Sequence, residues 1–91
     1  MKYLKILVLA EDLKQYNKWV AEQIEYLPEG YTWRKFENKF DITYGNRTTE
    51  YRVFTQRMGT DSLRGCCYDE ILPLTQLSDN EMMWIRLYVL R

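Results

Sequence analysis

The chain opens with two contrasting hydrophobic patterns. Residues 3–9 form a nearly continuous run of Ile, Leu and Val, which is typical of a strand covered on both faces. Apolar residues then recur at spacings of three and four, at Leu13, Tyr16, Val20, Ile24 and Leu27. This spacing places one apolar stripe along a helix, with acidic residues before it and Pro-Glu-Gly after it as start and stop signals. We therefore predict a central strand followed by an amphipathic helix.

The hydrophobic period changes to two from Tyr31 onward. Aromatic and apolar residues alternate with polar ones over residues 31–36, 39–44 and 51–53, which predicts three further strands. Gly45-Asn46 separates the last two runs, so residues 39–56 are predicted to form a β-hairpin. The alternation assigns to the core side of the sheet Trp33, Phe40, Ile42, Tyr44 and Tyr51. The cations of these runs fall on the outside.

The last third of the chain predicts one more strand and one more helix. Residues 70–74 are a short apolar run, and because proline cannot donate to a sheet, Pro73 either ends this strand or places it near an edge. Ser78 and Glu81 fit a capping box that starts a helix from Asp79 to about Leu90. This helix is apolar nearly all round, so it is either deeply buried or presents a face to another chain. A strand over residues 82–90 is the competing prediction.

These elements predict one small α/β domain over residues 1–91, because a chain of this length supports a single core. The predicted order is β-α-β-β-β-β-α, with a mixed sheet and a helix near each end of the chain packing on it. A domain this small buries about two-thirds of its unfolded surface, so contacts with a partner would add usefully to its stability.

The composition excludes several kinds of chemistry. The sequence has no histidine, and its two cysteines are the neighbours Cys66 and Cys67. Ser–His and Cys–His nucleophile pairs and the usual zinc sites are therefore excluded. Adjacent cysteines do not easily reach disulfide geometry, and reduced thiols fit the cytoplasm.

The first apolar run is far too short to span a bilayer, so we expect a cytoplasmic protein with no membrane partner.

Two acidic pairs are the remaining candidates for metal chemistry. Glu11-Asp12 follows the first predicted strand, where open α/β sheets usually bind ligands, and Asp69-Glu70 enters the last strand. Both pairs could hold magnesium, but they fit a helix N-terminus and a strand entrance equally well. The segment after the first strand has no glycine and places carboxylates where phosphates would lie, which excludes a standard nucleoside triphosphate site. We expect no metal, no cofactor and no enzymatic activity, and nucleotide binding there is the least favoured alternative.

One stretch resembles a known family. The order strand–helix–strand, a hairpin and then L-R-G-C-C-Y-D-E-I-L resembles the ATPase core of phage terminase large subunits and related P-loop helicases. The matching positions are Ile42-Thr43-Tyr44, Leu63-Arg64-Gly65 and residues 71–74. The Walker A loop is missing, and Pro73-Leu74-Thr75 replaces the terminal acidic pair. The resemblance implies a degenerate P-loop-like sheet without ATP hydrolysis, in a small phage accessory protein of the host cytoplasm, and carries over no catalytic residues.

The charge distribution supports one alternative function. The net charge is zero, so the chain has no strong overall field for nucleic acid. Residues 31–65, however, carry seven basic against four acidic residues, interleaved with aromatic ones. Because cations contact phosphates and aromatic faces stack on bases, residues 31–57 predict a single-stranded nucleic-acid-binding hairpin as the alternative. Its candidate phosphate contacts are Arg47, Arg52, Arg57 and Arg64. A solvated sheet face would explain the same surplus.

The preferred prediction is a non-enzymatic protein-interaction module, such as a small phage-type regulator or inhibitor that docks on a host or phage protein. It rests on the missing catalytic residues, the small core, the many aromatic residues and the apolar last helix. Aromatic residues and methionine, with a few arginines, are common interface anchors. The candidate contacts are Met82, Met83, Trp84 and Tyr88. The same helix could instead join copies of this chain into a homo-oligomer.

Overall fold

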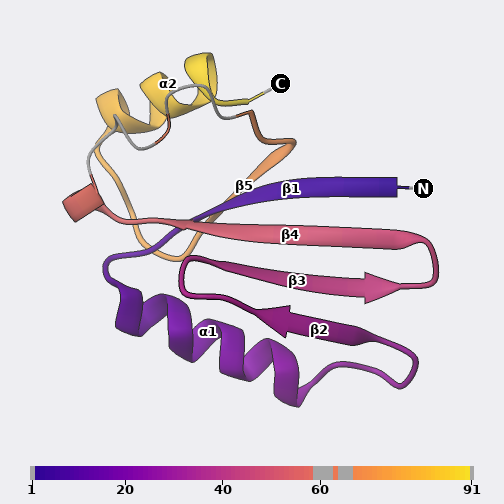
Figure 1. Cartoon of the computed structure of the whole chain (residues 1–91). Helices are drawn as coiled ribbons and strands as arrows, with labels where there is room; N and C mark the ends of the chain where they lie inside the picture. The colour runs from indigo at the N-terminus through magenta and orange to yellow at the C-terminus, as the bar shows by residue number, and fades with distance from the viewer. Residues whose placement is uncertain (1, 59–62, 64–66, 91) are drawn as a thin grey trace.

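Five strands form one mixed sheet in the order β2-β3-β4-β1-β5 (Figure 1). The computed structural model describes residues 2–58, 63 and 67–90. Its strands are β1 (Lys2–Leu9), β2 (Thr32–Lys35), β3 (Lys39–Tyr44), β4 (Arg47–Phe54) and β5 (Glu70–Pro73). Its helices are α1 (Leu13–Glu25), the short 3-10 helix η1 (Gln56–Met58) and α2 (Asp79–Tyr88). The predicted small α/β domain, its element order and its helix near each end are confirmed.

The strand β1 lies inside the sheet, parallel to both of its neighbours, β4 and β5. Its second half is buried on both faces because each face meets a separate part of the core. Leu7 and Leu9 pack with Phe54 and with α2, whereas Val8 packs with α1 and with Phe40. The continuous apolar run therefore predicted the central strand correctly.

The helix α1 begins where the sequence places an acidic residue. Asp12 is its N-cap and accepts a hydrogen bond from the backbone N–H of Gln15 at 2.8 Å, which satisfies one of the unpaired donors of the first turn. Tyr16 and Val20 are fully buried against the sheet. The Tyr16 hydroxyl donates to the backbone oxygen of Tyr51 at 3.1 Å and so ties the helix to β4. The predicted apolar stripe thus forms one side of the core.

The predicted hairpin forms from β3 and β4, and a two-residue loop fixes its register. Gly45 has a φ of 60°, and positive φ at the first loop residue alone is the pattern of a type II′ turn. Because the loop is this short, Tyr44 pairs with Arg47 and Asp41 pairs with Glu50. The strand β2 then pairs antiparallel with β3 and ends the sheet on this side.

The last strand and helix follow the local signals of the sequence. β5 is the other edge of the sheet and Pro73 is its last residue, which agrees with both roles predicted for that proline. Ser78 caps α2, and its hydroxyl oxygen accepts from the backbone N–H of Glu81 at 3.2 Å. The helix is confirmed and the competing strand is wrong, since Ile85 and Val89 at helical spacing are both fully buried.

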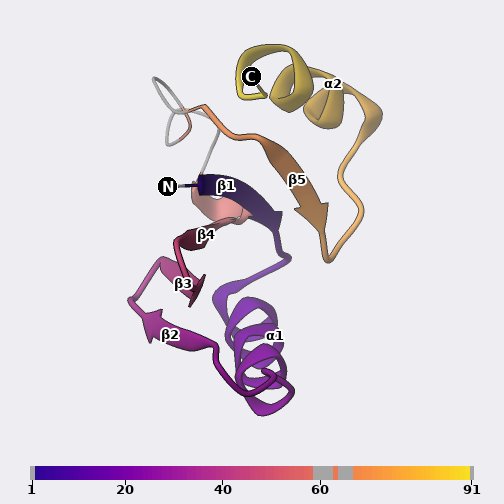
Figure 2. The same cartoon turned by 90° about the vertical axis from the view of Figure 1, so that its right-hand side faces the viewer.

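The two helices cover different parts of the sheet, on opposite faces. α1 covers β3 and β4 on one face, whereas α2 covers β1 and β5 on the other (Figure 2). On the face opposite α1, no described helix lies over β2, β3 and the first half of β4. Neither described helix is long and apolar enough to cross a membrane.

Candidate functional site

Of the predicted interface residues of α2, Met82 and Met83 line one shallow surface hollow. Met82 and Trp84 are half-buried and pack against the core beneath the helix. Met83 points outward with 61% of its surface exposed, and Leu87, one turn later, is 70% exposed. The side chain of Tyr88 lies outside the described residues. The outer face of α2 therefore offers the exposed Met83 and Leu87, which line a shallow hollow together with Asp79, Arg86 and the half-buried Met82.

The predicted phosphate contacts are also dispersed. Arg47 lies at the start of β4 on the face of α1, whereas Arg52 is on the opposite face of the same strand, because residues an odd number apart alternate. Arg57 is exposed on η1, beside α1. Arg64 lies outside the described residues. The described three do not form one groove, so the nucleic-acid site predicted from these arginines is not assembled as a unit.

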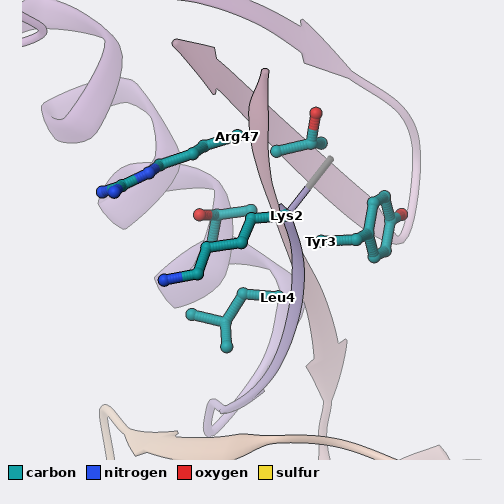
Figure 3. A pocket seen from close by; sticks show the side chains of 6 residues that line it. Lys2, Tyr3, Leu4 and Arg47 are labelled. Carbon is teal, nitrogen blue, oxygen red and sulfur yellow. The ribbon is translucent and has the colours of Figure 1, made fainter. Parts of the chain in front are cut away.

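Arg47 lines a separate hollow at the start of the sheet, of about 360 Å³. Lys2 and Leu4 of β1 point to the same side as Arg47, while Tyr3 points to the other (Figure 3). Both cations are exposed, and no side chain of opposite charge is among the residues that line the hollow. It is an open surface with two cations.

The aromatic residues of β2 and β3 extend beyond the end of α1. Alternation places Trp33 and Tyr44 on the same face as Phe40 and Ile42, as predicted, but their side chains lie beyond the core on that face. They are 47% and 52% exposed, because α1 ends before it covers them. Tyr31 stacks on Tyr44 with ring centres 4.6 Å apart. We call Tyr31, Trp33 and Tyr44 the aromatic patch.

The aromatic patch borders a free sheet edge. All four residues of β2 are exposed, and among the described residues β2 pairs only with β3. The backbone N–H of Phe36 donates to the oxygen of Lys39 at 2.8 Å. Since hydrogen-bonded pairs alternate along an antiparallel ladder, Trp33 and Lys35 direct their N–H and C=O groups away from β3. These groups are available to another strand.

On the face opposite α1, polar side chains stand in register across four strands. Lys5, Glu50, Asp41 and Arg34 form one cross-strand row, because each is paired with the next. Thr43 and Thr48 continue the polar surface on one side, with their hydroxyl oxygens 3.3 Å apart. We call this surface the open face, and it is made by Tyr3, Lys5, Arg34, Phe36, Lys39, Asp41, Thr43, Thr48, Glu50 and Arg52.

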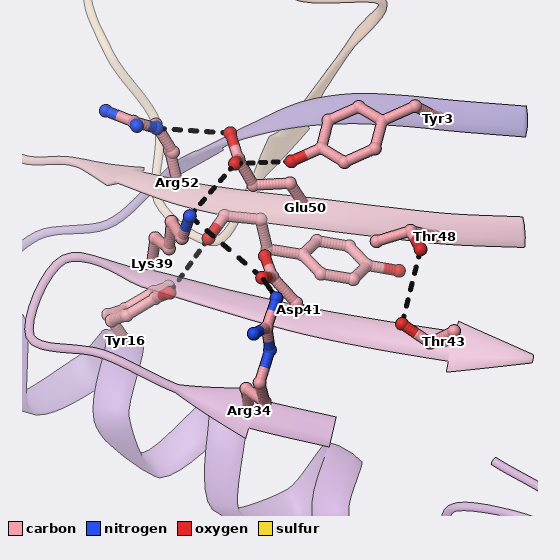
Figure 4. Close-up of polar contacts among 10 residues, drawn as sticks. Tyr3, Tyr16, Arg34, Lys39, Asp41, Thr43, Thr48, Glu50 and Arg52 are labelled. Carbon is pink, nitrogen blue, oxygen red and sulfur yellow. Dashed lines mark hydrogen bonds and ion pairs between the residues drawn. The ribbon is translucent and has the colours of Figure 1, made fainter. Parts of the chain in front are cut away.

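Two carboxylates are buried at the centre of the open face (Figure 4). The side chains of Asp41 and Glu50 are each 4% exposed, and like charges directly opposite one another destabilise a sheet. Three cations offset this repulsion. Lys39 lies 3.4 Å from Glu50 and 4.0 Å from Asp41, and Arg52 donates to Glu50 at 3.1 Å. Arg34 lies 3.5 Å from Asp41.

Tyr3 completes this cluster and links β1 to it. Its hydroxyl donates to Glu50 at 2.7 Å, and this hydrogen bond, together with burial and the charge of Glu50, raises the pKa of Tyr3 to about 12. Burial alone would raise the pKa of Glu50. The hydrogen bonds from Tyr3 and Arg52 and the charges of Arg52 and Lys39 outweigh burial, so the pKa of Glu50 falls below its usual value. Glu50 is therefore held as a carboxylate.

One oxygen of this cluster has no partner among the described atoms. Asp41 Oδ1 is buried without a hydrogen bond, while Asp41 Oδ2 faces both Arg34 and Lys39. A metal ion is a poor occupant, because two carboxylates among three cations leave a net positive cluster. Among the described residues, no group of three or more His, Cys, Asp or Glu side chains could hold a metal.

One carboxylate of each acidic pair predicted from the sequence has a structural role in the described part of the chain. Asp12 caps α1, and Asp69 Oδ2 accepts from the backbone N–H of Lys5 at 2.8 Å. Both are therefore explained by the helix start and the strand entrance. Cys67 is an exposed free thiol, and Cys66 lies outside the described residues.

The buried carboxylate pair is the feature that the sequence prediction missed. Alternation assigns Asp41 and Glu50 to the outer face, where charged residues usually stand in water. The signal that could have found the pair is the Gly45-Asn46 loop. Counting outward along the sequence from a two-residue loop is enough to place Asp41 opposite Glu50. Their burial, in contrast, depends on side chains from β1, β2, β3 and β4.

No protein-family model, no curated protein and no solved structure matches this chain, and its resemblance to phage ATPase cores stays a prediction.

Proposed function

We propose that this protein is a non-enzymatic interaction module that binds an extended segment of another protein along the outer edge of β2. The observation that carries the proposal is the position of this strand. β2 is an edge of the sheet, all four of its residues are exposed, and it borders the aromatic patch. Strand addition at such an edge uses main-chain hydrogen bonds for affinity and neighbouring side chains for specificity.

The backbone geometry of β2 supports this mode of binding. Trp33 and Lys35 direct their N–H and C=O groups outward, in the alternating arrangement that an added antiparallel strand requires. Arg34 and Lys35 put charge on the same strand. Charged residues on short edge strands disfavour indiscriminate pairing, so only a partner with complementary side chains gains from the contact.

The aromatic patch supplies the side-chain contacts of the proposed interface. Trp and Tyr are the residue types that most often dominate binding energy, because each buries a large area with few rotatable bonds. Tyr31 and Tyr44 are already held by their mutual stacking, and Trp33 stands beside them on the same face. A partner would therefore meet rings that are already positioned.

The outer face of α2 is the weaker candidate for docking. Met83 and Leu87 are well exposed, but Met82 and Trp84 contribute mainly to the core. A contact of two flexible side chains buries less area than the aromatic patch. A small phage-type regulator or inhibitor, as predicted from the sequence, is one form that this function would take.

The test compares three versions of the full chain as bait in lysate of its natural source: the original protein, Trp33→Ser and Met83→Ser. A protein retained by the original and by Met83→Ser, but lost with Trp33→Ser, is the expected partner. Its affinity for purified bait should fall about 30-fold with Trp33→Ser, as expected for an interface hot spot. A partner that binds Trp33→Ser with unchanged affinity would contradict the proposal, and one lost only with Met83→Ser would assign docking to α2.

A further inference from the structure

On the open face the cations are exposed to solvent, whereas the carboxylates that pair with them are buried. The side chain of Arg34 is 74% exposed and that of Arg52 is 46% exposed, whereas the two carboxylates beneath them are almost inaccessible. Lys39 stands between them, within reach of both carboxylates. A molecule that approaches this face therefore meets positive charge first.

Aromatic rings stand at opposite corners of the same surface. Phe36 lies beyond the end of β2, with Lys39 Nζ 4.9 Å and the guanidinium carbon of Arg34 5.8 Å from its ring centre. These contacts place its ring on the open face, and it is 46% exposed. Tyr3 lies on β1, three strands away, and half of its surface is exposed. Adjacent strands are about 4.8 Å apart, so the two residues are separated by roughly 14 Å across the strands. Phe36 is in register with Leu7 of β1, four residues from Tyr3, which adds about 13 Å along the strands.

We propose that the open face binds single-stranded nucleic acid, with Phe36 and Tyr3 stacking on bases and Arg34, Lys39 and Arg52 contacting phosphates. Sheets that bind single strands combine a basic surface with exposed aromatic rings in this way. Of the four phosphate contacts predicted from the sequence, only Arg52 belongs to the proposed site, whereas Arg34, Phe36 and Lys39 come from the same predicted region, residues 31–57. It is also distinct from the interface of the proposed function, which uses the outer edge of β2 and the aromatic patch on its other face.

The chemistry of the surface favours a single strand over the other anionic ligands. A duplex stacks its bases on each other, so their faces are not available to Phe36 and Tyr3. An acidic protein segment would satisfy the cations but would gain little from the two rings. The hydroxyls of Thr43 and Thr48, on the same face, add polar groups that can bond phosphate or sugar oxygens.

The buried carboxylates give the cations fixed positions. Arg52 and Lys39 are held by Glu50, and Arg34 and Lys39 by Asp41, so these side chains lose less conformational freedom when phosphate binds. The carboxylates also neutralise much of the charge, and binding should therefore be modest and salt-dependent. We expect a dissociation constant of about 10–100 µM at 50 mM salt. With three phosphate contacts, the logarithm of affinity should fall against the logarithm of salt with a slope of roughly −2.

The test is fluorescence anisotropy of the full chain with a labelled mixed-sequence strand of about 12 nucleotides, as DNA and as RNA. The decisive variants are matched pairs on β2 and at its end. Phe36→Leu and Arg34→Gln change the open face, whereas Trp33→Leu and Lys35→Gln make similar changes on the opposite face. All four residues are exposed, so circular dichroism should report an unchanged fold.

We expect Phe36→Leu to weaken binding about tenfold, as for the loss of one base stack, and Trp33→Leu to weaken it less than twofold. Arg34→Gln should reduce the salt slope by about 0.7, and Lys35→Gln should leave it nearly unchanged. Three outcomes would overturn the proposal: no binding at 50 mM salt, equal losses on both faces, or equal affinity for a polyglutamate peptide. Since the partner assay depends on Trp33 and this one on Phe36, either proposal can fail while the other stands.

Discussion

The two faces of β2, β3 and β4 differ in how they are completed. On one face, Phe40 and Val53 pack under α1 with Tyr16 and Val20, and apolar burial holds the layers together. On the other face no described helix covers β2, β3 or the first half of β4, and the central side chains there are nevertheless buried. Long side chains of neighbouring residues, such as Arg34 and Lys39, cover the two carboxylates there, and ion pairs take the place of apolar contacts. A sheet face can thus be closed by its own side chains, at the cost of holding two like charges together.

The largest difference between the faces should appear in matched phenylalanine substitutions. Phe40 is fully buried under α1, whereas Phe36 is about half exposed on the open face. We expect Phe40→Ala to lower the free energy of unfolding by about 3–5 kcal/mol, because it leaves a cavity. Phe36→Ala should change it by less than about 0.5 kcal/mol, as for most surface substitutions. Urea unfolding measures both, and a similar cost at the two sites would show that the open face is covered in solution.

Breaking the ion-pair cluster should have the next largest effect. Glu50→Gln keeps the shape of the side chain but removes the charge that Tyr3, Lys39 and Arg52 share. We expect a loss of about 1–3 kcal/mol in the free energy of unfolding, as for a charge-assisted hydrogen bond removed from a buried group.

A double-mutant cycle with Tyr3→Phe measures how much of that loss belongs to the Tyr3 hydrogen bond, and we expect a coupling of about 1 kcal/mol. Glu22→Gln, which changes an exposed carboxylate on α1, is the control for the loss of one charge. If Glu50→Gln stabilises the protein, repulsion between Glu50 and Asp41 outweighs the three cations.

On the face of α1, the turn before β2 should be sensitive to a single methyl group. Gly30 has a φ of 93°, and a Cβ built there would lie 3.1 Å from the Tyr44 ring. Gly30→Ala should therefore cost about 1–2 kcal/mol through backbone strain alone. Gly45→Ala is the control, because Gly45 also has positive φ but no atom within 4 Å of its Cβ position. A larger loss for Gly30→Ala, with altered Tyr fluorescence, would show that the Tyr31–Tyr44 stack is displaced.

The smallest expected effect is a dependence on pH in the acid range. The pKa of Glu50 is lower in the folded than in the unfolded protein, so this group stabilises the fold above its unfolded pKa. That contribution is lost as the pH falls through the folded value. The difference in melting temperature between the original protein and Glu50→Gln should therefore shrink below about pH 4.5. A difference that stays constant from pH 7 to pH 3 would contradict the lowered pKa.

The pKa of Tyr3 gives the complementary test at high pH. Because its folded pKa is raised, Tyr3 stabilises the fold below its unfolded value of about 10 and loses this effect as the pH rises towards 12. Tyr3→Phe cannot ionise and should lose less stability than the original protein over that range.

Local patterns in the sequence determined most of the fold. The apolar run of residues 3–9, the stripe from Leu13 to Leu27, the Gly45-Asn46 loop and the Ser78 cap each predicted the element that forms. They could do so because each depends on the backbone and on neighbours within a few residues. The register of β3 and β4 was equally accessible, since a two-residue loop leaves no other pairing in phase with the alternation.

Burial and assembly were decided only by the tertiary structure. The two-residue alternation predicted which face Trp33 and Tyr44 lie on, but it did not predict how exposed they are. Their exposure depends on where α1 ends over the sheet. The same period placed Asp41 and Glu50 outside, although side chains from other strands close over them. Sequence periodicity assigns each side chain to a face, whereas burial depends on which distant segments cover that face. The physical reason is that the alternation of side chains between the two faces is set within one strand. The layer that covers a face comes from other segments of the chain.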